Sequence, residues 1–375
     1  MYEIYAQAQE FASKHIAPNA RAYDEEARFP KDAFEAMARE GWLSLLVPAE
    51  YGGQGGDMEE HSQACMAFAE ASASTGLCYM MHNVALMDIK AHGSEQLKAA
   101  VFSDVVENGA FCALAESEFG TGTHFYNSQF QVEYGAEGVV LNGTKSMVTS
   151  ANQATYYLVG TPARNGTDSN SFLVKLGTEG VSFKEAAWQG MGMRSNVSAP
   201  MVLEDVKLGY EAQLGEEGTG AAQIFNVIAP YFITGLASVY SGCCNTLYAE
   251  AVAHATGRTY PDGTSLADIE TVQTHLARLY MLSNAATQQT RDAARAAVAA
   301  EEDAVLKIFS SRVFAGESAI ECGRIAMRVG GGKAYNKATN IERFLRDSYA
   351  NQIMAPSVDV LTVWLGKSVA GIPIP

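Results

Sequence analysis

The apolar residues of this 375-residue chain change their spacing twice, and this change limits the folds that the chain can adopt. Up to about residue 108 they recur every three or four residues, which is typical of amphipathic helices. Between about residues 109 and 217, short apolar runs alternate with Gly, Asn and Asp, as in a β domain. From about residue 218 the helical spacing returns. Helices and strands that are segregated in this way predict an α+β protein and not a doubly wound sheet.

We therefore predict three domains: an all-α domain over residues 1–108, a β-sandwich or β-barrel over residues 109–217, and a helical bundle over residues 218–375. No G-x-G-x-x-G run follows an expected strand, which disfavours a Rossmann domain. In the first domain, Pro18 should interrupt the helix expected over residues 5–22. Pro30 should open the next helix, because a proline at that position removes no helical hydrogen bond. Later helices are expected over residues 79–92 and 340–370.

Charge and composition argue against several classes of partner. The formal net charge of -16 disfavours nucleic acids and anionic membranes, since both are polyanions. We see no run of 18 apolar residues that would span a membrane, and residues 1–4 do not begin a secretion signal. The six cysteines have no CxxC spacing, and the histidines have no HxxxH or HExxH pattern. We expect a cytoplasmic protein with reduced thiols and no metal site.

Several short motifs follow one another along nearly the whole chain. They read FP at residues 29–30, VPAEYGGQG at 47–55, HGSEQLK at 92–98, CALAESEFGTG at 112–122, GTKSMVTSA at 143–151, GGKAY at 331–335 and ERFLRDS at 342–348. In this order and spacing they resemble the motifs of the acyl-CoA dehydrogenase family, although each motif alone is weak. The resemblance implies that family's fold, with a C-terminal four-helix bundle, and a non-covalently bound FAD.

The resemblance also implies which residues contact the flavin. Residues 112–122 are similar to the family's flavin segment A-x-T-E-P-x-A-G-S-D, and residues 143–151 to its G-x-K-x-W-I-T-N-A. By position, Thr149 corresponds to a threonine beside flavin N5, and Thr121 to a serine that contacts flavin and substrate. Glycines near residue 331 would let the adenosine diphosphate half of FAD approach the backbone. The full set implied for FAD is Cys112, Leu114, Ala115, Thr121, Met147, Val148, Thr149, Arg328, Gly331 and Gly332.

The C-terminal motif departs from the family at the position of its catalytic base. In the family, E-R-x-x-R-D-A is followed by I-Y-E-G-T, whose Glu removes the α-proton of an acyl thioester. Counting from residues 346–348 puts Ala355 at that position and Met354 beside it, where both would contact substrate together with Thr121. Some members keep the base at the start of the first helix of the C-terminal bundle, where this chain has Ala229. A methyl group cannot accept a proton.

Further departures surround the expected flavin. Ala115 replaces a threonine that hydrogen-bonds the flavin edge, Phe119 replaces a small residue, and Met147 replaces a tryptophan that covers one side of the ring. Methionine in place of tryptophan leaves a smaller, more flexible filler. This substitution either repacks the core without a functional effect or reshapes the pocket around flavin N5 and C4a, where oxygen would react. The family's R-x-x-F-G run, which reaches a neighbouring subunit, is degraded after Arg258, so a homodimer and a homotetramer both stay open.

Three functions remain open at this point. The first, which we expect, is a flavin oxygenase that uses O2 on a CoA-type or carrier-bound thioester, in aromatic-acid or specialised (antibiotic or tropone-type) metabolism. The second is an α,β-dehydrogenase with a relocated base, for which Glu118 is the candidate; its alternative role is a surface carboxylate that solvates the loop. The third is a non-catalytic flavin- or acyl-binding relative. The acyl group and the reductant of the flavin are not specified by the sequence.

Overall fold

The computed structural model describes residues 3–122, 128–184 and 188–374, and its first part is helical. The helices are α1 (Glu3–His15), α2 (Ala20–Glu26), α3 (Lys31–Arg39), α4 (Met58–Ala71), α5 (Ala73–His92) and α6 (Glu95–Asn108), with single turns η1 (Trp42–Ser44) and η2 (Ala49–Tyr51) before α4. Pro18 lies in the break between α1 and α2, and Pro30 directly precedes α3, as the sequence predicts. The helix predicted from residue 79 begins earlier, because the Ser72 hydroxyl caps it by accepting from Thr75 N.

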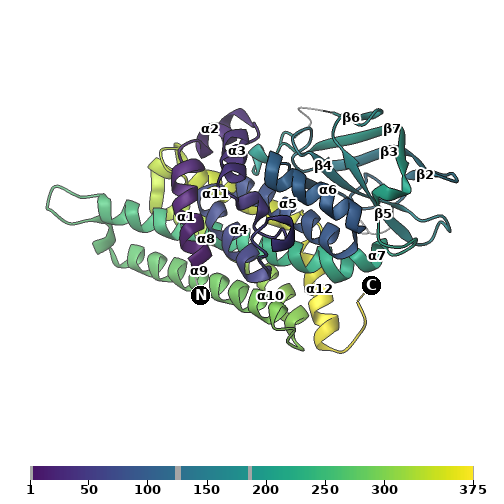
Figure 1. Cartoon of the computed structure of the whole chain (residues 1–375). Helices are drawn as coiled ribbons and strands as arrows, with labels where there is room; N and C mark the ends of the chain where they lie inside the picture. Colours follow the sequence, from purple (N-terminus) through teal and green to yellow (C-terminus); the bar gives the residue numbers. More distant parts are fainter. Residues whose placement is uncertain (1–2, 123–127, 185–187, 375) are drawn as a thin grey trace.

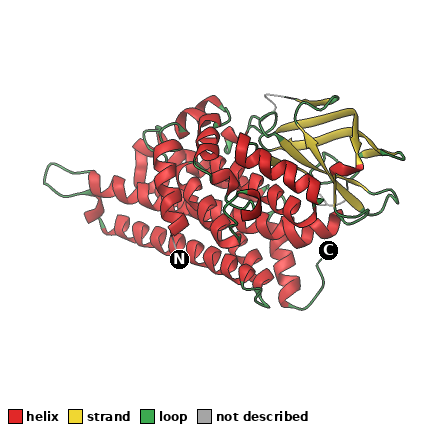
Figure 2. Cartoon of the chain, viewed as in Figure 1, coloured by secondary structure: helices red, strands yellow, loops and turns green. Residues whose placement is uncertain are grey.

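The middle part consists of two four-stranded sheets (Figure 2). Its strands are β1 (Cys112–Ala115), β2 (Gln131–Tyr134), β3 (Gly138–Val148), β4 (Tyr156–Pro162), β5 (Ser169–Lys175), β6 (Val181–Phe183), β7 (Ala199–Gly209) and β8 (Gln213–Leu214), with the turns η3 (Arg194–Asn196) and η4 (Tyr210–Ala212). The sheet orders are β1-β4-β5-β8 and β2-β3-β7-β6. Strands β1 and β4 run parallel, and the other pairs are antiparallel. The predicted β domain is thus a pair of sheets.

The C-terminal part is helical again. It contains α7 (Gly220–Gln223), a π-helical turn η5 (Ile224–Ile228), α8 (Ala229–Gly257), η6 (Leu266–Asp268), α9 (Glu270–Val298), α10 (Ala304–Tyr335), α11 (Ile341–Tyr349), η7 (Ala350–Gln352) and α12 (Val358–Val369). The single helix predicted over residues 340–370 is wrong. Pro356 disfavours a helical conformation at the residue before it, and the Ser357 hydroxyl then caps α12 by accepting from Val360 N.

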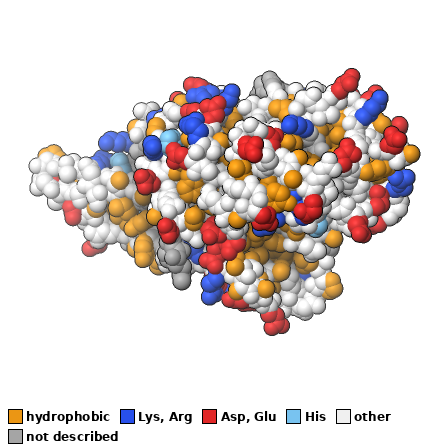
Figure 3. Space-filling view, in the orientation of Figure 1, with side chains coloured by type: hydrophobic (Ala, Val, Ile, Leu, Met, Phe, Trp, Pro, Cys, Tyr) orange, Lys and Arg blue, Asp and Glu red, His pale blue; other side chains and the backbone are white. Residues whose placement is uncertain are grey.

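The three parts pack around one hydrophobic core that includes residues from each of them. Figure 1 shows α8, α9 and α10 running along the length of the molecule, with the β domain at one end. The run Gly220–Gly257 is long and apolar enough, by length and composition, to cross a membrane, so the prediction that the chain has no such run is wrong. However, 78% of its most apolar 18-residue window is buried inside the fold, as expected of the core helix of a bundle. Charged side chains of both signs are scattered over the face in Figure 3.

Helix α11 carries the polar contacts that join the three parts. The Arg346 guanidinium donates to both carboxylate oxygens of Asp24 in α2, at 3.1 and 2.5 Å, and to the carbonyl of Met191 in the β domain at 2.9 Å. The next residue, Asp347, is buried and accepts a 2.6 Å hydrogen bond from Met193 N. Burial raises the pKa of Asp347 to about 6, against the opposing effect of Arg343. One turn of α11 therefore fixes both the first helices and the β domain.

We predict that Arg346→Ala lowers the free energy of unfolding by about 3 kcal/mol, because the buried Asp24 carboxylate loses its bidentate partner and keeps the more distant Arg194, at 4.0 Å. Urea unfolding followed by circular dichroism measures the loss. The matched control is Arg324→Ala, whose ion pair with Glu321 lies at the surface, and this variant should unfold like the wild type. Equal stability of the two variants would contradict the assigned role of Arg346.

Candidate functional site

A cavity of about 340 Å³ lies where the three parts of the chain meet. Helix α5 contributes Leu77 and Met81, and the C-terminal segment contributes Met354, Ala355 and Pro356. The other walls come from the β domain, from η5 and from the start of α8: Leu114, Glu116, Ser117, Glu118, Gly122, Ser146, Met147, Thr149, Trp188, Met193, Asn196, Ser198, Ile224, Ile228, Ala229 and Phe232. Most of this lining is apolar, so the cavity suits a largely apolar ligand.

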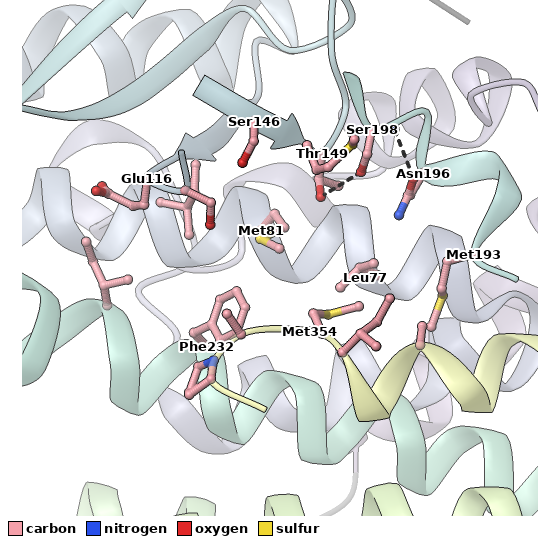
Figure 4. Close-up of a pocket in the computed structure, with 18 of the residues that line it drawn as sticks. Leu77, Met81, Glu116, Ser146, Thr149, Met193, Asn196, Ser198, Phe232 and Met354 are labelled. Carbon is pink, nitrogen blue, oxygen red and sulfur yellow. Dashed lines mark hydrogen bonds between the residues drawn. The ribbon is translucent and has the colours of Figure 1, made fainter. Parts of the chain in front are cut away.

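A row of short polar side chains runs along the β-domain wall (Figure 4). Ser146 lies near the end of β3, followed by Thr149, whose hydroxyl is 3.4 Å from that of Ser198. Asn196 orients the next turn by accepting from Ser198 N at 2.9 Å. Figure 4 shows this row across the cavity from Phe232 and Met354. A flat ring with polar atoms along one edge fits between a polar wall and an apolar wall of this kind.

The turn that carries Asn196 has an uncommon backbone. Met193 (φ 52°) and Val197 (φ 46°) flank it, and both are in the left-handed region, which non-glycine residues adopt rarely. Such a conformation persists only where surrounding contacts hold it. Here Met193 N donates to Asp347, and Met193 O accepts from the Trp188 indole at 3.1 Å. The contacts of α11 therefore shape this wall of the cavity.

The two alanines at the expected base positions both line this cavity. Ala355 belongs to the segment between η7 and α12, and Ala229 is the first residue of α8. Directly before Ala229 the backbone forms the π-helical turn η5, a wide turn that is frequent at functional sites. Segments from opposite ends of the C-terminal part thus bring two methyl groups to one cavity, at places where a carboxylate would be needed to accept a proton.

Glu118 lines the cavity but is neither a surface carboxylate nor a free one. Its side chain is 9% exposed, and its Oε1 accepts from the buried Lys145 Nζ at 2.6 Å. Its other oxygen accepts from Gln129 N at 3.0 Å, and Ser128 also donates to Oε1 at 2.5 Å. The proposed surface role is therefore wrong, because Glu118 neutralises a buried lysine. As a relocated base it would have to give up these contacts.

Glu116 is a cavity residue that was not predicted from the sequence. Its carboxyl packs over Gly160 of β4, where any side chain would collide with Oε2. Oε1 is enclosed and has no hydrogen-bond partner in the described part of the chain. Burial raises the pKa of Glu116 to about 7, Lys145 opposes the shift, and Asp88 and Glu118 add to it. The signal was the first acidic residue of the ESE run at residues 116–118. The different environments of its two carboxyl groups appear only in the folded chain.

The remaining predicted site residues fall into two groups. Leu114, Met147, Thr149, Met354 and Ala355 line the cavity, whereas Cys112, Ala115, Thr121 and Val148 are buried in or beside the same β-domain segments, outside the lining. Arg328, Gly331 and Gly332 lie at the C-terminal end of α10, away from the cavity lining. Gly331 has φ 52°, and a Cβ there would meet no atom within 4 Å, so its need for glycine is conformational. The described residues contain no cluster suited to a metal ion.

The sequence matches three models of one family. The acyl-CoA dehydrogenase N-terminal domain matches residues 2–109, the middle domain matches residues 113–206, and the C-terminal domain matches residues 234–369. Among curated proteins, the probable acyl-CoA dehydrogenase FadE25 of Mycobacterium tuberculosis (strain ATCC 25618 / H37Rv) is 28% identical over 374 residues, covering 98% of this chain and 94% of that protein.

Solved structures share the fold over almost the whole chain. Butyryl-CoA dehydrogenase from Megasphaera elsdenii has a TM-score of 0.92 at 22% identity, covering 99% of both chains. PigA with FAD and proline has a TM-score of 0.90 at 20% identity, covering 98% of this chain and 97% of that one. The prolyl acyl carrier protein oxidase AnaB has a TM-score of 0.86 at 21% identity, covering 97% and 98%. Homologues of this fold bind FAD, and the polar row beside an apolar wall fits its ring.

We predict that Thr149→Val weakens FAD binding or slows flavin reduction, because it deletes a hydroxyl from the polar row. The expected loss is about 1–3 kcal/mol, the cost of leaving a buried polar group without its partner. Titration of the FAD-free protein by flavin fluorescence measures it. Thr144→Val, on strand β3 just before Thr149 but outside the cavity lining, is the control. Unchanged FAD affinity and reduction in the Thr149 variant would remove that residue from the flavin site.

Proposed function

Since the chain belongs to the acyl-CoA dehydrogenase family, we propose that it binds FAD non-covalently and oxidises a thioester-linked acyl group in an O2-dependent reaction. FAD, when bound, supplies the electron transfer and the reactivity toward oxygen. The observation that carries the proposal is the pair of alanines, Ala355 and Ala229, on the wall of one cavity. A positioned general base contributes about 10²–10⁴-fold to a proton abstraction. Without one, simple α,β-dehydrogenation is disfavoured.

The chain's own residues would hold and shield the cofactor. Thr149 and Ser198 would offer hydroxyl groups to the polar edge of the ring, and the backbone of Leu114 would approach it from the end of β1. Met147 is 45% exposed beside them, where the family's tryptophan would cover the ring. This smaller side chain supports access of oxygen to that face. The apolar side chains on the opposite wall would exclude water from the reacting atoms.

The carrier of the acyl group is either CoA or a carrier protein. Both present the same pantetheine arm, and the likeness to AnaB supports a carrier protein as one possibility. No Lys or Arg occurs among the described residues that line the cavity, so a charged nucleotide would have to lie outside it. The proposal therefore concerns the acyl group and the arm, which are common to both carriers. A homodimer or homotetramer is proposed on the strength of the family resemblance.

A second candidate is an acyl-CoA dehydrogenase with a relocated base. The relation to FadE25 over 98% of this chain favours it. This candidate needs a general base, and Glu118 is already paired with Lys145. Only the first candidate reaction incorporates oxygen atoms from O2 into the organic product, and this difference can be measured.

We predict that the wild type forms little enoyl product from straight-chain acyl-CoA esters, and that Ala355→Glu raises this activity, because it returns a carboxylate to the cavity. The measurement is flavin bleaching after anaerobic mixing, together with analysis of the enoyl product. Ala370→Glu is the matched control, since it adds the same charge at an exposed position after α12. Efficient enoyl formation by the wild type without oxygen would favour the second candidate.

Turnover under ¹⁸O₂ tests the proposed function. Candidate acyl thioesters are supplied on pantetheine, and the products are analysed by mass spectrometry. We expect the label in the organic product. Label found only in hydrogen peroxide would show an oxidase and overturn the oxygenase proposal.

A further inference from the structure

The cavity holds more buried negative than positive charge at the end where β1 leaves the sheet. Glu116, Glu118 and Lys145 lie together there, and Asp88 of α5 is near enough to raise the pKa of Glu116. Asp88 is itself paired with His92 at 2.9 Å. With both carboxyls ionised, Lys145 balances one of them and leaves the other uncompensated.

The hydrogen bonds assign the uncompensated charge to Glu116. Lys145 Nζ donates to Glu118 Oε1 at 2.6 Å, to the backbone carbonyl of Glu116 at 3.2 Å and to Ser128 Oγ at 3.4 Å. An ammonium has three protons, so these contacts use all of its donors. In the described part of the chain the Glu116 carboxyl has no salt bridge, and its Oε1 has no hydrogen-bond donor. A buried carboxylate without partners is costly. Because Oε1 is enclosed, the oxygen that a ligand in the cavity would reach is Oε2, for which the described residues show no hydrogen-bond donor either.

We propose that Glu116 is a substrate-recognition residue that pairs with a protonated amine on the acyl group, so that the protein prefers aminoacyl thioesters to plain alkanoyl thioesters. This inference rests on the proposed function, because it takes a thioester to be the ligand of this cavity. Among the described lining residues, Glu118 is the other acidic side chain, and Lys145 already engages it. The apolar part of the cavity lining, which includes Leu114 and Ile224, suits the carbon skeleton of such a group.

The position of Glu116 distinguishes recognition from proton abstraction. Figure 4 places Ser146 between Glu116 and Thr149 along the cavity wall. If Thr149 marks the reacting end of the flavin, Glu116 lies further along the cavity. A group there contacts a part of the substrate away from the bond that is oxidised.

Protonation of Glu116 gives the pairing a pH dependence. The pKa of Glu116 is raised to about 7 by burial, with Asp88 and Glu118 adding to the effect and Lys145 opposing it. Below pH 7 the ligand-free carboxyl therefore holds a proton, and pairing with a cation must release it. Affinity for an amine should rise as the pH increases through 7 and fall again where the amine loses its own proton. Affinity for an uncharged acyl group should lack the first of these changes.

The test uses the FAD-loaded protein and three pantetheine analogues in which an amide replaces the thioester, so that no turnover occurs. They carry hexanoyl, 2-aminohexanoyl or 6-aminohexanoyl groups, and binding is followed by the change in flavin absorbance. We expect the 6-aminohexanoyl analogue, whose amine lies away from the α-carbon, to bind at least about tenfold more tightly than the hexanoyl analogue, as a charge-assisted hydrogen bond allows. Glu116→Gln should abolish the preference, whereas Glu133→Gln, at an exposed position on β2, should keep it.

Proton release gives a second readout that needs no variant. At pH 6.5 the preferred amino analogue should release a proton into a dilute indicator buffer when it binds the wild type, and the hexanoyl analogue should release none. Binding of all three analogues with equal affinity, a preference that survives in Glu116→Gln, or an amino analogue that binds without proton release would overturn the inference alone. If no analogue perturbs the flavin, the proposed function fails together with it.

Discussion

The contacts of α11 are the constraint on which the rest of the structure depends. Arg346 binds Asp24 from α2 and the carbonyl of Met191 from the β domain, and Asp347 holds Met193 N. Met193 and Val197, which flank the turn η3, have left-handed backbones that would relax without such support. Because Met193 lines the cavity, and α11 leads directly into the segment with Met354 and Ala355, one helical turn positions two of its walls.

Within this frame, the chemistry of the cavity depends on which polar groups already have partners. Thr149 and Ser198 form a short row of hydroxyl groups, and Glu118 forms an ion pair with Lys145. Ala355 and Ala229, which the sequence resemblance puts at the base positions, both line the cavity. If these positions are right, the cavity would bind and orient a ligand without the usual proton acceptor. Among the residues that the structure describes, Glu116 Oε1 finds no hydrogen-bond partner. The oxygen-dependent reaction that we propose, on an amine-bearing acyl group, would use each of these features.

Much of the fold could be predicted from the sequence, because hydrophobic spacing and proline positions report local structure directly. The order of helices and strands and the break near Pro18 follow from them. The end of α11 could not be predicted in this way, because the helical spacing of apolar residues continues across Pro356 into α12, whereas the backbone turns there. The motifs also led to Thr149, Met147 and Ala355, which the structure brings to one cavity.

The missed features of the site are those that depend on contacts between distant residues. Glu116 and Glu118 are equivalent in a sequence motif, and only the position of Lys145, on another strand, shows that one is paired and the other is not. Likewise, Phe232 and Asn196 reach the cavity from parts of the chain that no motif connects. Long-range pairing of this kind has no signature in local spacing.

A crystal structure of the protein with FAD and the preferred aminohexanoyl analogue tests the central claim most directly. Our account predicts the flavin ring against Thr149 and Ser198, the acyl chain between the ring and the apolar wall near Phe232, and the amine within hydrogen-bond distance of Glu116. It also predicts that no carboxylate lies within reach of the ligand's α-carbon. A ring bound elsewhere, or a carboxylate in contact with that carbon, would contradict the account.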